Sequence, residues 1–130
     1  MARKKLYYRK ETDNKLRWDG EAAGVPFELY VPKWRVPSPV PAIVEVELRV
    51  ASGSAADSNP VTQKMVLRDP GLREQTISAV LEKCSGHTKT IRYDPVDAET
   101  AEIGDVYVPF CLTFGGVQRL SVTVSWRASG

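Results

Sequence analysis

Every second residue is apolar in the stretch Ala42-Ile43-Val44-Glu45-Val46-Glu47-Leu48-Arg49-Val50. Successive side chains of a β-strand point to opposite faces, so a period of two is typical of a strand with one buried face. Three of the four intervening residues are charged, which suits the face exposed to solvent. The pattern therefore predicts a half-buried strand over 42–51.

Strand patterns flank this stretch on both sides. On its N-terminal side, residues 6–10 and 15–18 surround a polar turn and predict a hairpin, and residues 27–31 alternate again. On its C-terminal side, residues 61–67 alternate and predict a strand antiparallel to the central one. Residues 88–93 have the composition of one more strand.

The C-terminal part of the chain predicts a second hairpin. Its strands are residues 106–114 and 117–126, with Gly115-Gly116 at the turn. A three-residue loop sets apolar residues opposite one another, whereas a two-residue loop mixes apolar with polar residues. The expected pairs are Val106 with Val124, Val108 with Val122, and Phe110 with Leu120.

Two segments carry helix signals. Asp69-Pro70 is typical of a helix start, because aspartate caps free N–H groups and proline lacks a donor that the first turn leaves unpaired. Helical spacing then relates four residues, namely Ile77, Val80, Leu81 and Cys84. With Gly86 as its end, this predicts an amphipathic helix over 69–86. Asp94-Pro95 and Gly104 predict a second, short helix.

These elements add up to an α+β fold. We expect a mostly antiparallel sheet of about five to seven strands, with one amphipathic helix packed on one face and a second short helix. The alternative is a β-sandwich or a small barrel with helical insertions. The 130 residues suit a single domain, 1–130. Within it, residues 1–24 would form a basic N-terminal hairpin or arm, and the proline-rich residues 32–41 a stiff connector over the surface.

Composition and cysteine content limit the classes to which this protein can belong. Apolar residues make up 42% and charged residues 26%, as in globular domains, and the net charge is only +2. A secretory signal needs an apolar stretch after its positive start, but here charges return at Arg9-Lys10. No apolar stretch is long enough to cross a bilayer. Cys84 and Cys111 are more typical of separate thiols than of a disulfide. We expect a cytoplasmic protein without membrane contact.

The sequence carries no constellation that predicts catalysis or metal binding. The single histidine, His87, follows Cys84 near the expected helix end, where the helix dipole disfavours a thiolate. Adding Cys111 gives three zinc-ligand candidates, whereas a structural site needs four. Residues 94–105 are acidic and suit a solvated face, with a cation site as the alternative. The carboxylates there are Asp94, Asp97, Glu99, Glu102 and Asp105. We expect no catalytic residue, no metal and no cofactor.

Basic and aromatic residues are interleaved in the first twenty positions, which hold seven Lys or Arg against three Asp or Glu. Cations follow phosphates and aromatic rings stack on bases, as in single-strand-binding proteins. Lys33-Trp34-Arg35 adds another ring between two cations. The structural alternative is that aromatics favour strands and lysines protect strand edges. The candidate nucleic-acid-binding residues are Arg3, Lys4, Lys5, Tyr7, Tyr8, Arg9, Lys10, Arg17 and Trp18.

The function that these patterns favour is a non-catalytic binding or assembly module. It would use sheet edges or the N-terminal hairpin to meet a protein partner or to self-associate into an oligomer, since edge strands expose unpaired donors and acceptors. One alternative is a nucleic-acid-binding protein that uses the basic and aromatic N-terminal segment. The other is a small enzyme of unknown reaction, which would depend on His87.

Overall fold

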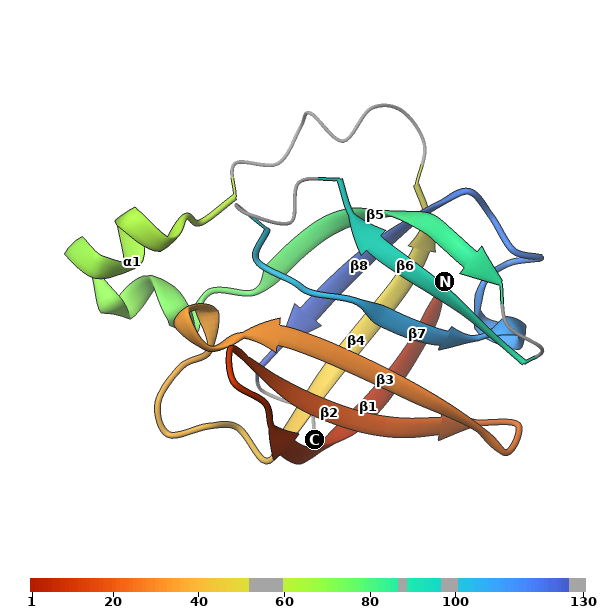
Figure 1. The fold of residues 1–130 in the computed structure, drawn as a ribbon, viewed down its shortest axis with the longest axis horizontal. Coiled ribbons are helices and arrows are strands. Elements are labelled where there is room, and N and C mark those ends of the chain that lie inside the picture. The colour runs from red at the N-terminus through yellow and green to blue at the C-terminus, as the bar shows by residue number, and fades with distance from the viewer. Residues whose placement is uncertain (52–59, 87–88, 97–100, 127–130) are drawn as a thin grey trace.

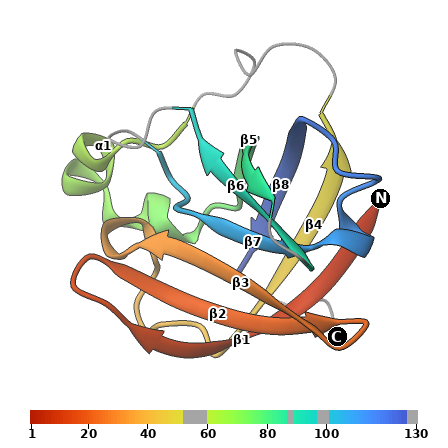
Figure 2. The same ribbon diagram turned by 45° about the vertical axis from the view of Figure 1, so that its right-hand side comes forward.

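The chain folds into a closed antiparallel β-barrel of eight strands (Figure 1). The computed structural model describes residues 1–51, 60–86, 89–96 and 101–126. The strands follow one another around the barrel in the order β1-β2-β3-β7-β6-β5-β8-β4, and β4 pairs with β1 to close the ring. Figure 2, turned from the first view, shows α1 beside the ring of strands rather than on one of its faces.

The strands and helices of the described chain have the following bounds. The strands are β1 Ala2–Glu11, β2 Lys15–Ala22, β3 Val25–Pro32, β4 Ile43–Val50, β5 Ile77–Gly86, β6 Thr90–Pro95, β7 Val106–Pro109 and β8 Arg119–Ser125. The one α-helix is α1, Gln63–Arg68, and three short 3-10 helices are η1 Lys33–Arg35, η3 Pro70–Glu74 and η4 Phe110–Leu112.

The barrel interior is filled by the apolar face of each strand. On β4, the side chains of Val44, Val46 and Leu48 are fully buried, whereas Glu45 and Glu47 lie on the outer face. Val46 stands between Lys4 of β1 and Val124 of β8 in the ladder. The central alternating stretch is therefore a strand, as predicted, and its buried face lines the core of a closed barrel.

The α+β prediction is wrong, and the small-barrel alternative fits. The predicted amphipathic helix over 69–86 is instead a short 3-10 turn followed by β5. Ile77 and Leu81 point into the core at strand spacing, and Val80 lies on the other face of the strand. Asp69 does cap a helical turn, because its side chain accepts a hydrogen bond from Gly71 N at 3.1 Å. That turn is η3, which ends at Glu74 and does not continue into a longer helix.

The predicted strand over 61–67 is also wrong, because most of this segment belongs to α1. Its start is capped by Thr62, whose hydroxyl accepts a hydrogen bond from Met65 N at 3.3 Å. Val66 is buried, and Leu67 remains 75% exposed. The alternation of apolar and polar residues over so few positions did not distinguish one helical turn from a strand.

The predicted C-terminal hairpin does not form. Val106 and Val108 belong to β7, which pairs with β3 and β6, whereas Val122 and Val124 belong to β8, which pairs with β4 and β5. The valines and Leu120 point inward, as predicted, but the two strands pair with other strands. Phe110, expected opposite Leu120, lies in η4 and is 53% exposed. The loop between them carries η4 and the turn at Gly115-Gly116, and it crosses the end of the barrel past β6 and β5.

The second predicted helix is absent from the described residues. Asp94 and Pro95 are the last residues of β6, and residues 101–105 are not helical. The remaining positions, 97–100, lie outside the described part of the chain. In contrast, the hairpin of β1 and β2 is confirmed, with Tyr8 opposite Trp18, and so is the strand expected at 27–31. The strand expected over 88–93 is found as β6, Thr90–Pro95.

The proline-rich segment holds a buried ion pair at the α1 end of the barrel. Arg35 is fully buried, and its guanidinium Nε lies 2.7 Å from Glu102 Oε1. Its other two nitrogens donate to the carbonyls of Arg73 at 2.9 Å and Gln75 at 2.8 Å. The indole of Trp126 donates to the same Gln75 carbonyl at 3.1 Å. This set of contacts, the Arg35 clasp, ties η1, η3 and the segment before β7 together.

None of the helices in the described ranges is both long and apolar enough to span a membrane.

Replacing Arg35 with methionine should lower the free energy of unfolding by about 3–5 kcal/mol, because the Glu102 carboxylate stays buried without its partner. Urea denaturation measures this change. The matched control is Arg3→Met, which breaks an exposed pair with Glu47 and should cost at most about 1 kcal/mol. Equal effects of the two substitutions would contradict the structural role given to the clasp.

Candidate functional site

Two of the predicted nucleic-acid residues on β1, Arg3 and Lys5, lie beside glutamates of β4. Arg3 contacts Glu45 at 3.4 Å and Glu47 at 3.0 Å, and Lys5 stands opposite Glu45 in the ladder. The hydrogen bond from Arg3, with another from Arg49, holds the pKa of Glu47 below its ordinary value. Barrel closure therefore sets carboxylates beside the basic strand, and Arg3 is compensated within the protein.

The remaining candidates are divided between the surface and the core. Arg17 bonds Asp19 at 2.7 Å and also pairs with Glu28, while Arg9 lies 4.0 Å from Asp19. The hydrogen bond to Asp19 raises the pKa of Arg17. Trp18 is fully buried, and its indole N–H donates to the Pro41 carbonyl at 2.9 Å. Trp18 thus belongs to the core and presents no face to a ligand.

Most side chains of β1 are exposed, whereas most of those on β2 are half-buried or buried. Tyr7 is 55% and Tyr8 40% exposed, and the Tyr8 ring meets the edge of Trp18 at a centroid distance of 5.8 Å. Lys5 and Lys10 are exposed, and Lys4 is half-buried. Nucleic-acid binding by residues 3–18 stays a prediction, with fewer free cations than the sequence indicated.

A polar belt crosses the outer faces of β2, β3, β7 and β6. The guanidinium of Arg17 lies 5.8 Å from the centre of the Tyr30 ring, and that ring meets Tyr107 edge-on at 6.3 Å. Tyr107 stands opposite Arg92 in the next ladder, and Arg92 bonds Asp94 at 2.9 Å. Because carboxylates pair with both arginines, the belt satisfies its own charges and stabilises the outer face.

The acidic stretch divides into two unrelated sets of contacts. Asp94 and Asp105 interact beside Arg92, whose guanidinium lies 3.5 Å from Asp105. Burial, followed by the hydrogen bond with Asp94, raises the pKa of Asp105. Burial opposes ionisation of Asp94 too, but hydrogen bonds from Arg92 and Cys84 outweigh it and lower its pKa. Glu102 instead faces Arg35 in the clasp.

Among the described residues, no group of three or more His, Cys, Asp or Glu side chains is placed to hold a metal ion. Asp97, Glu99 and His87 lie outside the described residues. The candidate site formed by Cys84 and His87 therefore lies outside them as well. Cys84 and Cys111 are both exposed free thiols. Cys84 hydrogen-bonds to Asp94, which raises the pKa of its thiol and keeps it protonated near neutral pH.

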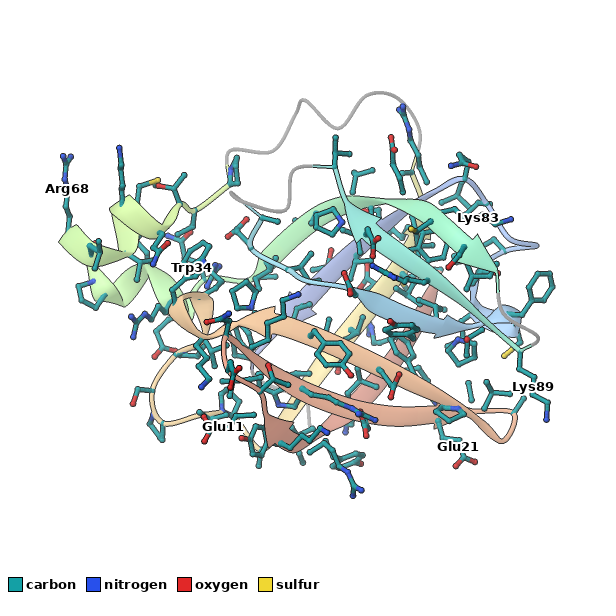
Figure 3. The ribbon with its side chains drawn as sticks, in the orientation of Figure 1. Glu11, Glu21, Trp34, Arg68, Lys83 and Lys89 are labelled. Atoms are coloured by element: carbon teal, nitrogen blue, oxygen red, sulfur yellow. The ribbon has the colours of Figure 1, made fainter. Side chains whose placement is uncertain are left out.

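A cleft of about 480 Å³ opens at the α1 end of the barrel. Four segments far apart in the sequence form it: the tip of the β1–β2 hairpin, the η1 turn with the end of β3, the start of α1, and the segment before β7. The lining residues are Asp13, Asn14, Lys15, Pro32, Lys33, Trp34, Gln63 and Ala101. Trp34 is partly exposed here, whereas Trp18 and Trp126 are buried. Figure 3 places Trp34 beside α1, at the end away from Lys83 and Lys89.

Backbone contacts hold the walls of this cleft in place. Lys33 N donates to the Asn14 carbonyl at 3.0 Å and joins η1 to the hairpin tip. Across the tip, Lys33 Nζ pairs with Glu11 at 3.0 Å. Arg35, two residues on, is anchored in the clasp. The basic motif around Trp34 was visible in the sequence, but Asn14 and Gln63 were missed, since only the fold brings them together.

The opposite end of the barrel is covered by the loop from η4 to β8. Thr113, fully buried, fixes it: its hydroxyl donates to Phe110 O at 2.7 Å and accepts from Gly116 N at 3.0 Å. Phe114 has a φ of 55°, followed by Gly115 at 85° and Gly116 at 79°. The left-handed conformation costs a residue with a side chain roughly 1–2 kcal/mol. The loop therefore keeps an unfavourable conformation at an aromatic residue.

Comparison with models of known families, with characterised proteins and with solved structures gives no match for this chain.

Alkylation of the two thiols tests the electrostatics around Cys84. Asp94→Asn removes the charge that favours the protonated thiol, so the pKa of Cys84 should fall and its reaction with iodoacetamide near neutral pH should become several-fold faster. Cys111, read by mass spectrometry in the same sample, is the internal reference. An unchanged ratio of the two rates would show that Asp94 does not control this thiol.

Proposed function

We propose that this protein is a non-catalytic binding module that takes an extended peptide segment of a partner protein in the cleft beside Trp34. The observation that carries the proposal is that the tip of the N-terminal hairpin, η1 and α1 line one concavity with an accessible indole. Clefts with an aromatic wall and a few polar groups are typical ligand sites.

The lining chemistry favours a peptide. Asn14 and Gln63 carry side-chain amides, which donate to and accept from peptide groups. Trp34 and Pro32 offer apolar surface for an aliphatic or proline side chain, as in other grooves that bind extended segments. Charges of both signs, from Lys15, Lys33 and Asp13, suit a chain with mixed side chains better than a uniformly charged polymer.

The walls are organised before a ligand arrives, which favours binding because little conformational entropy is lost. The Lys33–Asn14 backbone bond fixes the hairpin tip against η1, and the Arg35 clasp fixes η1 against the barrel. Trp34 stands between these two anchored residues. An aromatic side chain on such a support has the properties of an interface hot spot.

Barrel closure changes which part of the protein a partner would contact. Adding a strand to a sheet requires a free edge, and each of the eight strands described is paired on both sides. The hairpin tip, which projects beyond the ladder, therefore supports the proposal better than a sheet edge. A cytoplasmic location remains part of the proposal, and its support is that both cysteines are free thiols.

Selection from a random peptide library displayed on phage tests this proposal. We expect enriched peptides whose affinity falls at least about tenfold in Trp34→Ala, the usual loss at an aromatic hot spot. Leu67→Ala is the matched control, because it removes an exposed apolar side chain of α1 that does not line the cleft. Peptides that bind the Trp34 variant as tightly as the parent, or a selection without enrichment, would refute it.

A further inference from the structure

The end of the barrel opposite the cleft presents two exposed phenylalanines on the loop that Thr113 fixes. Phe110 is 53% and Phe114 37% exposed. A Cβ atom placed on Gly116 would lie 3.3 Å from Phe110 Cε2 and 3.8 Å from Lys83 Nζ, so the ring and the ammonium group adjoin the same surface point. The lack of a side chain at Gly116 keeps this space open.

A second lysine contacts the same loop through its backbone. Lys89 precedes β6, and its carbonyl accepts a hydrogen bond from Phe110 N at 3.0 Å. Neither Lys83 nor Lys89 makes an ion pair with any residue in the described ranges. Figure 3 shows both lysines at the end of the barrel away from Arg68 and α1. We call Lys83, Lys89, Phe110 and Phe114 the aromatic-lysine platform.

We propose that the aromatic-lysine platform binds single-stranded nucleic acid, with unpaired bases stacked on the phenylalanines and phosphates contacting the lysines. Stacking on aromatic side chains combined with cations along the backbone is how proteins hold single strands without reading their sequence. This site is separate from the peptide cleft and from residues 3–18.

The composition of the platform favours a nucleic acid over a protein partner. Lysine is depleted in protein–protein interfaces, where tyrosine, tryptophan and arginine predominate. Two lysines without an ion pair in the described ranges, at the same end of the barrel as two exposed rings, instead complement a polyanion that carries flat bases. A duplex would suit the site less well, because its bases are stacked on one another and are not available to the rings.

The backbone at Phe114 gives a second, independent reason. Glycine adopts a positive φ without a steric cost, and the next two residues of the loop are glycines. A phenylalanine at φ 55° is thus unfavourable for folding, while its ring stays partly exposed. Unfavourable conformations of this kind concentrate at functional sites, and ligand contact is a role that the ring can fill.

Fluorescence anisotropy of a labelled short oligothymidylate against salt concentration tests the proposal. We expect binding that weakens with salt, with a logarithmic slope about 1.4 smaller in magnitude for Lys83→Gln/Lys89→Gln, because two phosphate contacts are lost. Lys64→Gln/Arg68→Gln removes the same charge at the α1 end and should leave the slope unchanged. Equal effects of the two double variants, or no binding by the parent, would overturn the site.

Substitutions of the two rings distinguish the contribution of stacking from that of charge. Phe110→Ala should weaken binding at least about fivefold, and Phe110→Tyr should retain it, since base stacking needs only the ring. Phe114→Gly relieves the positive φ, so it should keep or raise the midpoint of thermal unfolding while binding weakens. Unchanged affinity in Phe110→Ala and Phe114→Gly would refute stacking. A loss in Lys5→Gln/Lys10→Gln alone would assign binding to β1 instead.

Discussion

Pairing of β1 with β4 is the constraint on which the rest of the structure depends. These strands are separated by β2, β3 and the proline-rich segment, yet Leu6 lies opposite Val44 and Lys5 opposite Glu45. Once this ladder forms, the described strands close into a ring in which each strand pairs with a neighbour on both sides. Apolar side chains then share one enclosed interior. Contacts with other molecules must use side chains on the outer face, or the loops at the two ends.

Both ends are held by buried polar groups rather than by more apolar packing. At the α1 end, the guanidinium of Arg35 bonds a carboxylate and two carbonyls. At the other end, Thr113 and the Tyr93 hydroxyl, which donates to the Val117 carbonyl at 2.7 Å, fix the loop before β8. Directional bonds of this kind allow one arrangement of each loop, whereas apolar contacts allow several. The loops therefore present Trp34 and Phe114 from defined positions.

The sequence allowed most inward faces to be predicted, but few of the strand partners. Alternation located β4 and the inward residues of β7 and β8, because side-chain direction depends only on the local backbone. It could not show that Val124 lies between Val46 and Ile77, since in a closed interior any apolar face complements any other. Over 77–86, the apolar residues also satisfied a helical period, and the capping signal before them favoured the wrong choice.

The charge of the candidate surfaces was also hard to predict, because it depends on which strands become neighbours. Residues 1–20 are strongly basic as a sequence, but a surface is made by neighbours in space, and closure sets Glu45 and Glu47 of β4 beside that strand. Charge counted along the chain therefore overstated the basic face. Lys83 and Lys89 gave no such signal, because they are distant in sequence from Phe110, and only the order β7-β6-β5 brings them to it. Where a chain closes on itself, the unpaired charges that remain at the loop ends are the better guide to binding.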